Sequence, residues 1–283
     1  HGLPADQRAD DARSAAFTSA PLEEAVEVLG APVASLRVEH PGPSAIVSVK
    51  LSDVSSEGEA QLVTSGVLNL SHRNGHERPE PFRGTENVRI ELQATGWRFL
   101  EGHRIRVSVA GSDWPTVWPL PTTDPLVLLM GPDGACRVEL PGTPPDAEPY
   151  EPAGEIRESS DRAGWEWRSG PSTWEIVTDT LAGTSGIRAS DAWSVRSPNR
   201  ELRAKESRRY QAFISEADPL GADVEGEATF RLDRPDVSVR STARGRFRAT
   251  EEEFLYDIRL DVREGGGIVH RDRWRGSVPR RLC

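Results

Sequence analysis

The chain has little cysteine, with only Cys136 and Cys283 among 283 residues. Two thiols are too few for the disulfide framework that stabilises small secreted domains, and their positions do not reveal whether they pair. The simplest expectation is therefore a protein of the reducing cytoplasm. Methionine is rarer still, since Met130 is the single example and the chain opens with His1. We expect that a tag, a signal peptide or a further domain preceded this start.

Long apolar runs and an excess of positive charge are also missing. The longest apolar run, residues 126–130, is far shorter than the roughly 20 residues that cross a bilayer as a helix. The chain has 35 Lys and Arg against 45 Asp and Glu, a formal net charge of −10. Because such a surface repels phosphates and anionic lipid headgroups, we expect no nucleic-acid partner and no membrane partner.

Apolar residues in the first half of the chain recur at every second position. The alternating sets are Val47, Val49 and Leu51, then Val88, Ile90 and Leu92, then Ile105, Val107 and Val109. A period of two predicts strands that have one face in a core and the other face in water. Glycine and proline separate these runs, which is typical of a β-sandwich.

The second half of the chain has longer alternating runs. Residues 254–262 predict one long strand, and the glycines at 265–267 predict a hairpin turn into a further strand. A second hairpin is expected to turn at residues 233–236, and residues 198–206 are the one stretch for which we expect a helix. Between the halves, proline and acidic residues at 143–155 indicate a linker.

Several spaced motifs in the first half carry a family resemblance. They are Pro21-Leu22-Glu23-Glu24, Val28-Leu29-Gly30, the run from Gly66 to Arg73, Gly102-His103-Arg104 and the pair Trp114-Pro115 and Trp118-Pro119. Together they resemble the carboxy-terminal β-domain of the CocE/NonD serine hydrolases, relatives of cocaine esterase and Xaa-Pro dipeptidyl-peptidase. The resemblance implies an all-β chain with a connector at 1–20, a jelly-roll, galactose-binding-like sandwich at 21–142, the linker, and an antiparallel β-sheet domain at 156–283.

The same resemblance implies a role without catalysis in this chain. No Gly-x-Ser-x-Gly nucleophile elbow occurs, and the nearest approaches are Gly42-Pro43-Ser44 and Gly183-Thr184-Ser185-Gly186. The serine, histidine and aspartate of the family would belong to an upstream α/β-hydrolase domain that acts on a small ester or on a peptide bond after proline. We expect no catalytic residue, metal or cofactor here, and an isolated chain without activity.

The segment that contains Trp114 and Trp118 is the candidate binding site. Its prolines at 115, 119 and 121 cannot donate to a sheet, so both indoles are expected on a stiff loop at a strand end. In the family the equivalent loop lies towards the hydrolase domain. We therefore expect these two residues to pack on that domain or to line its acyl pocket, and packing in the core of this chain is the remaining alternative. Most of the other six tryptophans are expected in cores or domain interfaces.

Alternatives to this interpretation remain open. His72 and His76, with His103 as a third ligand, could form a metal site, but Asn74-Gly75 predicts a strand entering a turn that separates the two rings. Arg73 is expected to pair with a carboxylate or to cap strand ends. A stand-alone carbohydrate-binding β-sandwich and an assembly element that forms a homodimer are the other functions that we consider.

Overall fold

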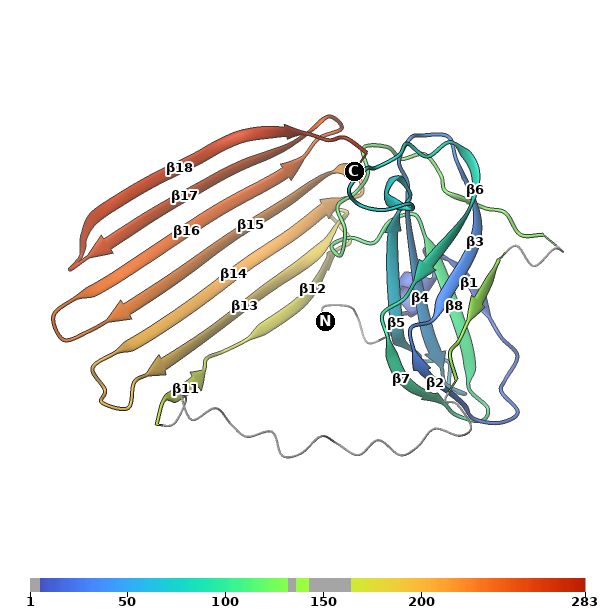
Figure 1. The fold of residues 1–283 in the computed structure, drawn as a ribbon, viewed down its shortest axis with the longest axis horizontal. Coiled ribbons are helices and arrows are strands. Elements are labelled where there is room, and N and C mark those ends of the chain that lie inside the picture. The colour runs from blue at the N-terminus through green and yellow to red at the C-terminus, as the bar shows by residue number, and fades with distance from the viewer. Residues whose placement is uncertain (1–5, 132–135, 143–163, 283) are drawn as a thin grey trace. The chain divides into compact units, whose positions relative to one another are not determined.

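The computed structural model describes residues 6–131, 136–142 and 164–282 (Figure 1). The chain divides into two units, the first comprising His1–Pro149 with Arg281–Cys283 and the second comprising Tyr150–Arg280. Nearly all of the described secondary structure is β-strand, as predicted. The predicted linker at 143–155 lies outside the described residues. None of the described helices has the length and apolar character that crossing a membrane requires.

The first unit is built from antiparallel sheets. One sheet has the order β1-β8-β4-β5, a second has the order β10-β3-β6 with β9 also paired to β3, and β2 pairs with β7. The elements are α1 (Arg8–Asp11), β1 (Ala15–Thr18), β2 (Val26–Gly30), β3 (Val33–His40), β4 (Ile46–Val54), β5 (Ala60–Asn69), the 3₁₀-helix η1 (Leu70–His72), β6 (Gly84–Glu91), β7 (Thr95–Phe99), β8 (Arg104–Ala110), β9 (Val127–Leu128) and β10 (Arg137–Glu139). The alternating runs of the first half correspond to β4, β6 and β8.

The second unit is one antiparallel sheet with the order β11-β13-β14-β15-β16-β17-β18, in which β12 also pairs with β13. Its strands are β11 (Glu166–Ser169), β12 (Thr173–Asp179), β13 (Thr184–Arg196), β14 (Arg203–Ser215), β15 (Asp218–Asp233), β16 (Ser238–Ala249), β17 (Glu253–Glu264) and β18 (Gly267–Pro279). Both predicted hairpins are confirmed, one between β15 and β16 and the other between β17 and β18.

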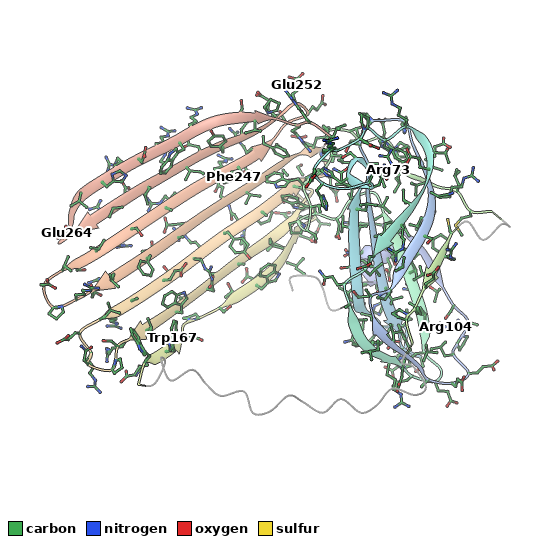
Figure 2. The ribbon with its side chains drawn as sticks, in the orientation of Figure 1. Arg73, Arg104, Trp167, Phe247, Glu252 and Glu264 are labelled. Carbon is green, nitrogen blue, oxygen red and sulfur yellow. The ribbon has the colours of Figure 1, made fainter. Side chains whose placement is uncertain are left out.

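The two faces of this sheet differ in chemistry. Paired residues share a face, so the register defines a row across seven strands: Trp174, Ala189, Tyr210, Gly226, Gly245, Ile258 and Trp274. We call the face that carries this row the apolar face. Trp167 and Phe247, both labelled in Figure 2, belong to it by the same register. The alternate positions, among them Arg244 and Arg246, form the polar face.

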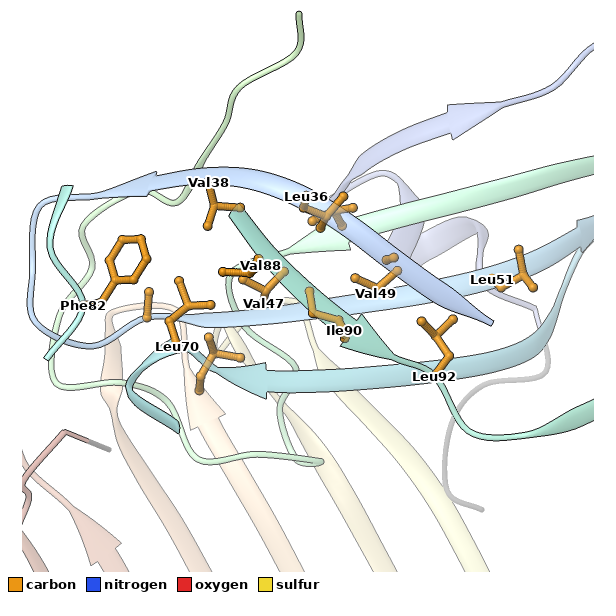
Figure 3. Close-up of a cluster of buried hydrophobic side chains, with 14 of the residues drawn as sticks. Leu36, Val38, Val47, Val49, Leu51, Leu70, Phe82, Val88, Ile90 and Leu92 are labelled. Carbon is orange, nitrogen blue, oxygen red and sulfur yellow. The ribbon is translucent and has the colours of Figure 1, made fainter. Parts of the chain in front are cut away.

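The core of the first unit lies between strands of its two larger sheets. Its fully buried side chains include residues of β2, β3, β4, β6 and β7 and of the segments beside them, and Figure 3 labels several from β3, β4 and β6. Phe82, Leu70 and Leu92 are among the largest of these side chains and all are 2% exposed or less. Each buried aliphatic or aromatic side chain of this kind contributes about 1.5–3 kcal/mol, so alternation between apolar and polar residues is enough to fix the strand register.

The prediction that one face of β4 is exposed to solvent is wrong. Every residue of β4 is buried, including Ser48, Lys50 and Asp53. Lys50 Nζ contacts Asp10 at 2.9 Å and Asp113 at 3.3 Å, so the segment around α1 and the loop after β8 lie against this face. Charged side chains from distant parts of the sequence cover this face of β4. The pattern of apolar and polar residues within β4 does not predict such contacts.

The helix predicted at residues 198–206 is also wrong. Residues 203–206 begin β14, which pairs with β13 and β15 along its length. The preceding turn contains Arg200 in a left-handed conformation, with φ of 62°, and Ser197 N donates to Leu202 O at 2.9 Å. Helix propensity in this short polar stretch is outweighed by hydrogen bonds to two neighbouring strands, because intrinsic propensities are worth less than 1 kcal/mol per residue.

The carboxy-terminal residues belong to the first unit. The carbonyl oxygen of Leu282 accepts hydrogen bonds from Ser44 Oγ at 3.1 Å, Asn69 Nδ2 at 2.8 Å and Ser71 Oγ at 3.0 Å. Asn69 also caps η1 by accepting from Ser71 N. The chain therefore leaves the first unit, forms the eight-stranded sheet, and returns to the first unit before it ends.

Candidate functional site

The loop after β8 brings the two predicted site residues together. Trp114 and Trp118 are half-buried, and their rings meet edge to face with centroids 5.4 Å apart. The peptide bond between Trp114 and Pro115 is cis, and Val117 N donates to Asp113 O at 3.0 Å. Leu120, at the end of the same segment, joins the hydrophobic core. The two indoles therefore lie on a loop that follows a strand, as predicted, and contacts hold this loop at both ends.

A buried polar network fixes the start of this loop. Asp113 accepts from Ser48 Oγ at 3.0 Å and pairs with Lys50, whose Nζ also donates to Asp10. Burial alone would lower the pKa of Lys50, but hydrogen bonds and charge from Asp10 and Asp113 raise it above its ordinary value. Lys50 is therefore a permanent cation at neutral pH that ties the loop to the middle of β4.

Trp114 has one unusual feature. Its Nε1 is buried and has no hydrogen-bond acceptor among the described residues. A buried indole N–H normally finds a partner, since leaving such a donor unpaired costs about 1–3 kcal/mol. The Trp114 ring therefore contributes its shape and apolar surface to this site. Its N–H makes no hydrogen bond to the described residues.

A second polar group lies on β4. Asp53 accepts from Trp97 Nε1 at 3.0 Å and contacts His103 Nδ1 at 2.9 Å. In the described part of the chain, no serine or threonine hydroxyl is hydrogen-bonded to the His103 ring, so this pair lacks the nucleophile of a hydrolytic triad. Its neighbours explain its role: Leu22 N donates to His103 O and Gly102 N donates to Leu22 O. Two of the sequence motifs thus meet here and join β4 and β7 to the turn before β8.

The two histidines before β6 are closer than the sequence indicated. The rings of His72 and His76 have centroids 5.2 Å apart and Nδ1 atoms 3.3 Å apart, so the expectation that the turn separates them is wrong. The strand that was expected to enter the turn ends in η1, which places His72 over His76. His103 is elsewhere, beside Asp53, and no group of three metal-binding side chains occurs among the residues with described positions.

Arg73, in the same motif, pairs with a carboxylate, which is one of its two expected roles. Its guanidinium binds both carboxylate oxygens of Glu86, at 2.5 and 2.9 Å. It also donates to the carbonyls of Leu70 and Glu80 at 2.9 and 3.0 Å, and it lies over the Phe82 ring. The motif is therefore structural, because Arg73 ties η1 to β6 and to the edge of the core.

The polar face of the second unit contains a feature that the sequence reading missed. A hollow of about 860 Å³ is lined by seven arginines and three carboxylates: Arg188, Arg209, Arg244, Arg246, Arg248, Arg259, Arg275, Glu225, Glu227 and Asp257. Glu227 pairs with two arginines, and a hydrogen bond from Arg273 lowers the pKa of Asp257 to about 2. Arginine at alternate positions along β16 and β18 was the signal that could have located this surface.

The first unit is thus an antiparallel β-domain, and the polar side chains described above make structural contacts within it. Residues 3–133 match the family model of the X-Pro dipeptidyl-peptidase C-terminal non-catalytic domain. This part of the chain is similar to that family, and two similar proteins are named as a serine esterase and as cocaine esterase. The resemblance read from the sequence motifs is confirmed.

Individual relatives cover only part of the chain. A Mycobacterium bovis protein named as a serine esterase is 30% identical over 156 residues, which are 48% of this chain and 25% of that protein. Cocaine esterase from a Rhodococcus species is 33% identical over 116 residues, 40% of this chain and 20% of that protein. The solved structure of an alpha-amino acid ester hydrolase is 23% identical, covers 49% of this chain and 27% of that one, and has a TM-score of 0.45. The chain spans about a quarter of the length of the first of these relatives.

Proposed function

We propose that this chain is the carboxy-terminal part of a serine hydrolase and that it stabilises an upstream α/β-hydrolase domain and shapes access to its active site. The substrate of the whole enzyme would be a small ester or a peptide with proline before the scissile bond. The family match of residues 3–133 and the names of the two relatives support this proposal. The low cysteine content favours a cytoplasmic location.

The finer architecture is part of the same proposal. We assign the first unit to the jelly-roll, galactose-binding-like sandwiches, because two antiparallel sheets enclose one core to which both contribute strands. A rigid sandwich suits a domain that holds another domain in position, since catalytic geometry tolerates displacements of well under 1 Å.

The observation that carries the proposal is the loop with Trp114 and Trp118. The network around Asp113, the hydrogen bond from Val117 N to Asp113 O and the burial of Leu120 hold two large aromatic rings in one arrangement. Rigid aromatic side chains lose little entropy on binding and are enriched among the residues that dominate protein interfaces. The proposed contact is with the surface of the hydrolase domain beside its acyl pocket.

The test uses the complete enzyme, with its upstream domain, and the double variant Trp114→Ala and Trp118→Ala. We expect a lower unfolding temperature for the hydrolase domain and a changed preference between short and long p-nitrophenyl acyl esters. Leu29→Ala is the matched control, because Leu29 is a large residue of the same unit that is 57% exposed. Unchanged stability and acyl preference in the double variant would rule out this role for the loop, and binding of glycans by the isolated chain would favour a carbohydrate-binding module.

A further inference from the structure

The polar face of the second unit carries a row of positive charges. Paired residues share a face, so the register places six side chains next to one another on β11, β13, β14, β15, β16 and β17 (Figure 1): Arg168, Ser194, Lys205, Arg231, Arg240 and Arg263. We call the five basic residues of this set the cation row. It contains no carboxylate, although the whole chain has a formal net charge of −10. The total charge therefore gives no sign of this basic surface.

Most charges of the cation row are not neutralised by a neighbour. Arg231 pairs with Asp233 at 2.8 Å, whereas no carboxylate of the described residues forms an ion pair with the other four members. All five side chains are exposed. Like charges directly opposite each other destabilise a sheet, so Lys205, Arg231 and Arg240 on adjacent strands do not serve its stability. Residues that conflict with the stability of their own fold are expected at functional sites.

The surface around the cation row adds hydroxyl groups. Two hollows, of about 590 and 430 Å³, both have Arg231 and Arg240 in their lining, and the other members of the row line one hollow or the other. Two positions further along three of the strands lie the hydroxyl residues Ser207, Thr229 and Thr242, which line the same hollows. Guanidinium and hydroxyl groups together are the donors that bind phosphate oxygens.

Two carboxylate residues also line the hollows, and both have partners. Asp261 accepts from Arg271 Nε at 2.7 Å, and this hydrogen bond, with the charges of Arg271 and Arg263, lowers the pKa of Asp261 below its ordinary value. The side chain of Glu206 belongs to the apolar face, where it accepts from Trp193 Nε1 at 2.8 Å. Neither carboxylate therefore cancels the positive charge of the row.

The spacing of the cation row fits a short and dense line of negative charge. Its four members on β14 to β17 are about 4.8 Å apart, which gives four cations within about 14 Å. An extended acidic peptide places side chains on one side only every 6.7 Å or so, and thus supplies fewer charges over the same length. Duplex nucleic acid or a lipid bilayer would reach beyond the row to the carboxylates that make the chain acidic overall, and these repel it. A chain of linked phosphate groups avoids both problems.

The hollows offer no stacking partner to a nucleobase. Trp193 is the only aromatic residue among those that line them, and by the register its ring belongs to the apolar face. Proteins that recognise single bases stack them on aromatic side chains. The phosphate groups themselves, and not an attached nucleoside, are therefore the part of a ligand that this surface can recognise.

We propose that the cation row binds a chain of linked phosphate groups, whose oxygens accept from the arginine and lysine side chains of the row and from the hydroxyl groups beside it. Inorganic oligophosphate and the triphosphate of a nucleotide are the two sources of such a chain, and the row would hold both by the same groups. This inference stands on the second unit alone and goes beyond the proposed function of the first.

The test is isothermal titration calorimetry of the full chain with inorganic tripolyphosphate at an ionic strength of about 0.15 M, where charges are screened beyond about 8 Å. We expect saturable binding that the same concentration of monophosphate does not reproduce. The double variant Lys205→Gln and Arg240→Gln should weaken it at least about tenfold, because two charged donors are lost. Arg248→Gln with Arg275→Gln is the matched control, since it removes the same charge from the same face about 20 Å or more from the row, and its dissociation constant should stay within about twofold.

Two further readouts separate this site from its alternatives. The urea midpoint of Lys205→Gln with Arg240→Gln should be unchanged or higher, because like charges are removed from adjacent strands, so weaker binding cannot be ascribed to unfolding. ATP should bind with an affinity within about tenfold of that of tripolyphosphate. The proposal is refuted if the unaltered chain does not bind tripolyphosphate, or if both double variants weaken binding equally. ATP binding with which tripolyphosphate does not compete, or a preference for duplex DNA or phosphatidylserine vesicles, would also refute it.

Discussion

Removal of the Lys50 ammonium group gives the most direct test of how the candidate loop is held in place. The side chain of Lys50 is 11% exposed and that of its partner Asp113 is 6% exposed, whereas its other partner, Asp10, is 41% exposed. In Lys50→Met, Asp10 turns to water at little cost, because exposed pairs contribute at most about 1 kcal/mol. Asp113 stays buried with only Ser48 as a donor. Because breaking a buried pair from one side costs about 3–5 kcal/mol, we expect a loss of about 3 kcal/mol.

The measurement is native-state hydrogen exchange at the amides of β4, which reports the stability of the first unit by itself. Lys205→Met is the control, since Lys205 is the only other lysine and is exposed on the second unit; its change should stay within about 0.5 kcal/mol. Adding Asp113→Asn to Lys50→Met removes the stranded charge and should restore at least half of the loss. A loss below about 1 kcal/mol in the single variant, or no recovery in the double variant, would refute this account of the network.

The same network predicts a pH dependence. The pKa of Lys50 is raised in the folded chain above the ordinary lysine value of 10.5. Its contribution to stability is therefore complete below pH 10.5 and is lost as the pH rises through the higher folded-state pKa. The difference in stability between the unaltered chain and Lys50→Met should accordingly be constant around neutrality and shrink only in strongly alkaline solution.

Two further predictions concern single side chains. Trp97→Phe removes one of the two hydrogen-bond partners of the buried Asp53 carboxylate, the other being His103, and should lower the free energy of unfolding in urea by about 1–3 kcal/mol. Trp114→Phe removes an unpaired N–H and should leave that free energy unchanged or slightly higher. The opposite order would contradict the assigned hydrogen bonds. Asp257 should titrate at a pKa of about 2 in NMR spectra, and its contribution to stability, present above the ordinary value of 3.8, should disappear as the pH falls through about 2. Arg273→Gln should return this pKa towards 3.8, and an unchanged titration would refute the assigned cause.

Alternation between apolar and polar residues was sufficient to predict the strands, because burial of one face outweighs every local preference. It located β4, β6 and β8 and the long strand β17, and it identified both hairpins of the second unit. The candidate loop was predictable for a related reason, since its prolines exclude it from a ladder and leave its two indoles at a strand end. The strands, the hairpins and the loop depend on residues that are close in the sequence, so sequence patterns can predict them.

Contacts between distant segments could not be predicted in this way. The cover over β4 comes from Asp10, forty residues before Lys50, and from Asp113, which lies beyond β8. The proximity of His72 and His76 depends on a single turn of 3₁₀-helix. A turn of three residues is too short to produce a recognisable period in the sequence. Tryptophans that we expected in cores or interfaces, such as Trp167 and Trp174, are 57% and 49% exposed on the apolar face. The alternation of residues predicts which side chains share a face of the sheet, but it does not predict whether that face is buried.

Leu282 is hydrogen-bonded to Ser44, Asn69 and Ser71 of the first unit. The eight-stranded sheet is therefore an insertion in the sequence of the first unit. Because the strands of this sheet lie in the sequence between two segments of the first unit, another module can replace them without interrupting any strand of the first unit. The carbonyl of Leu282, one residue before Cys283, accepts three hydrogen bonds, so an affinity tag fused after Cys283 would disturb these bonds more than a tag at the other end of the chain.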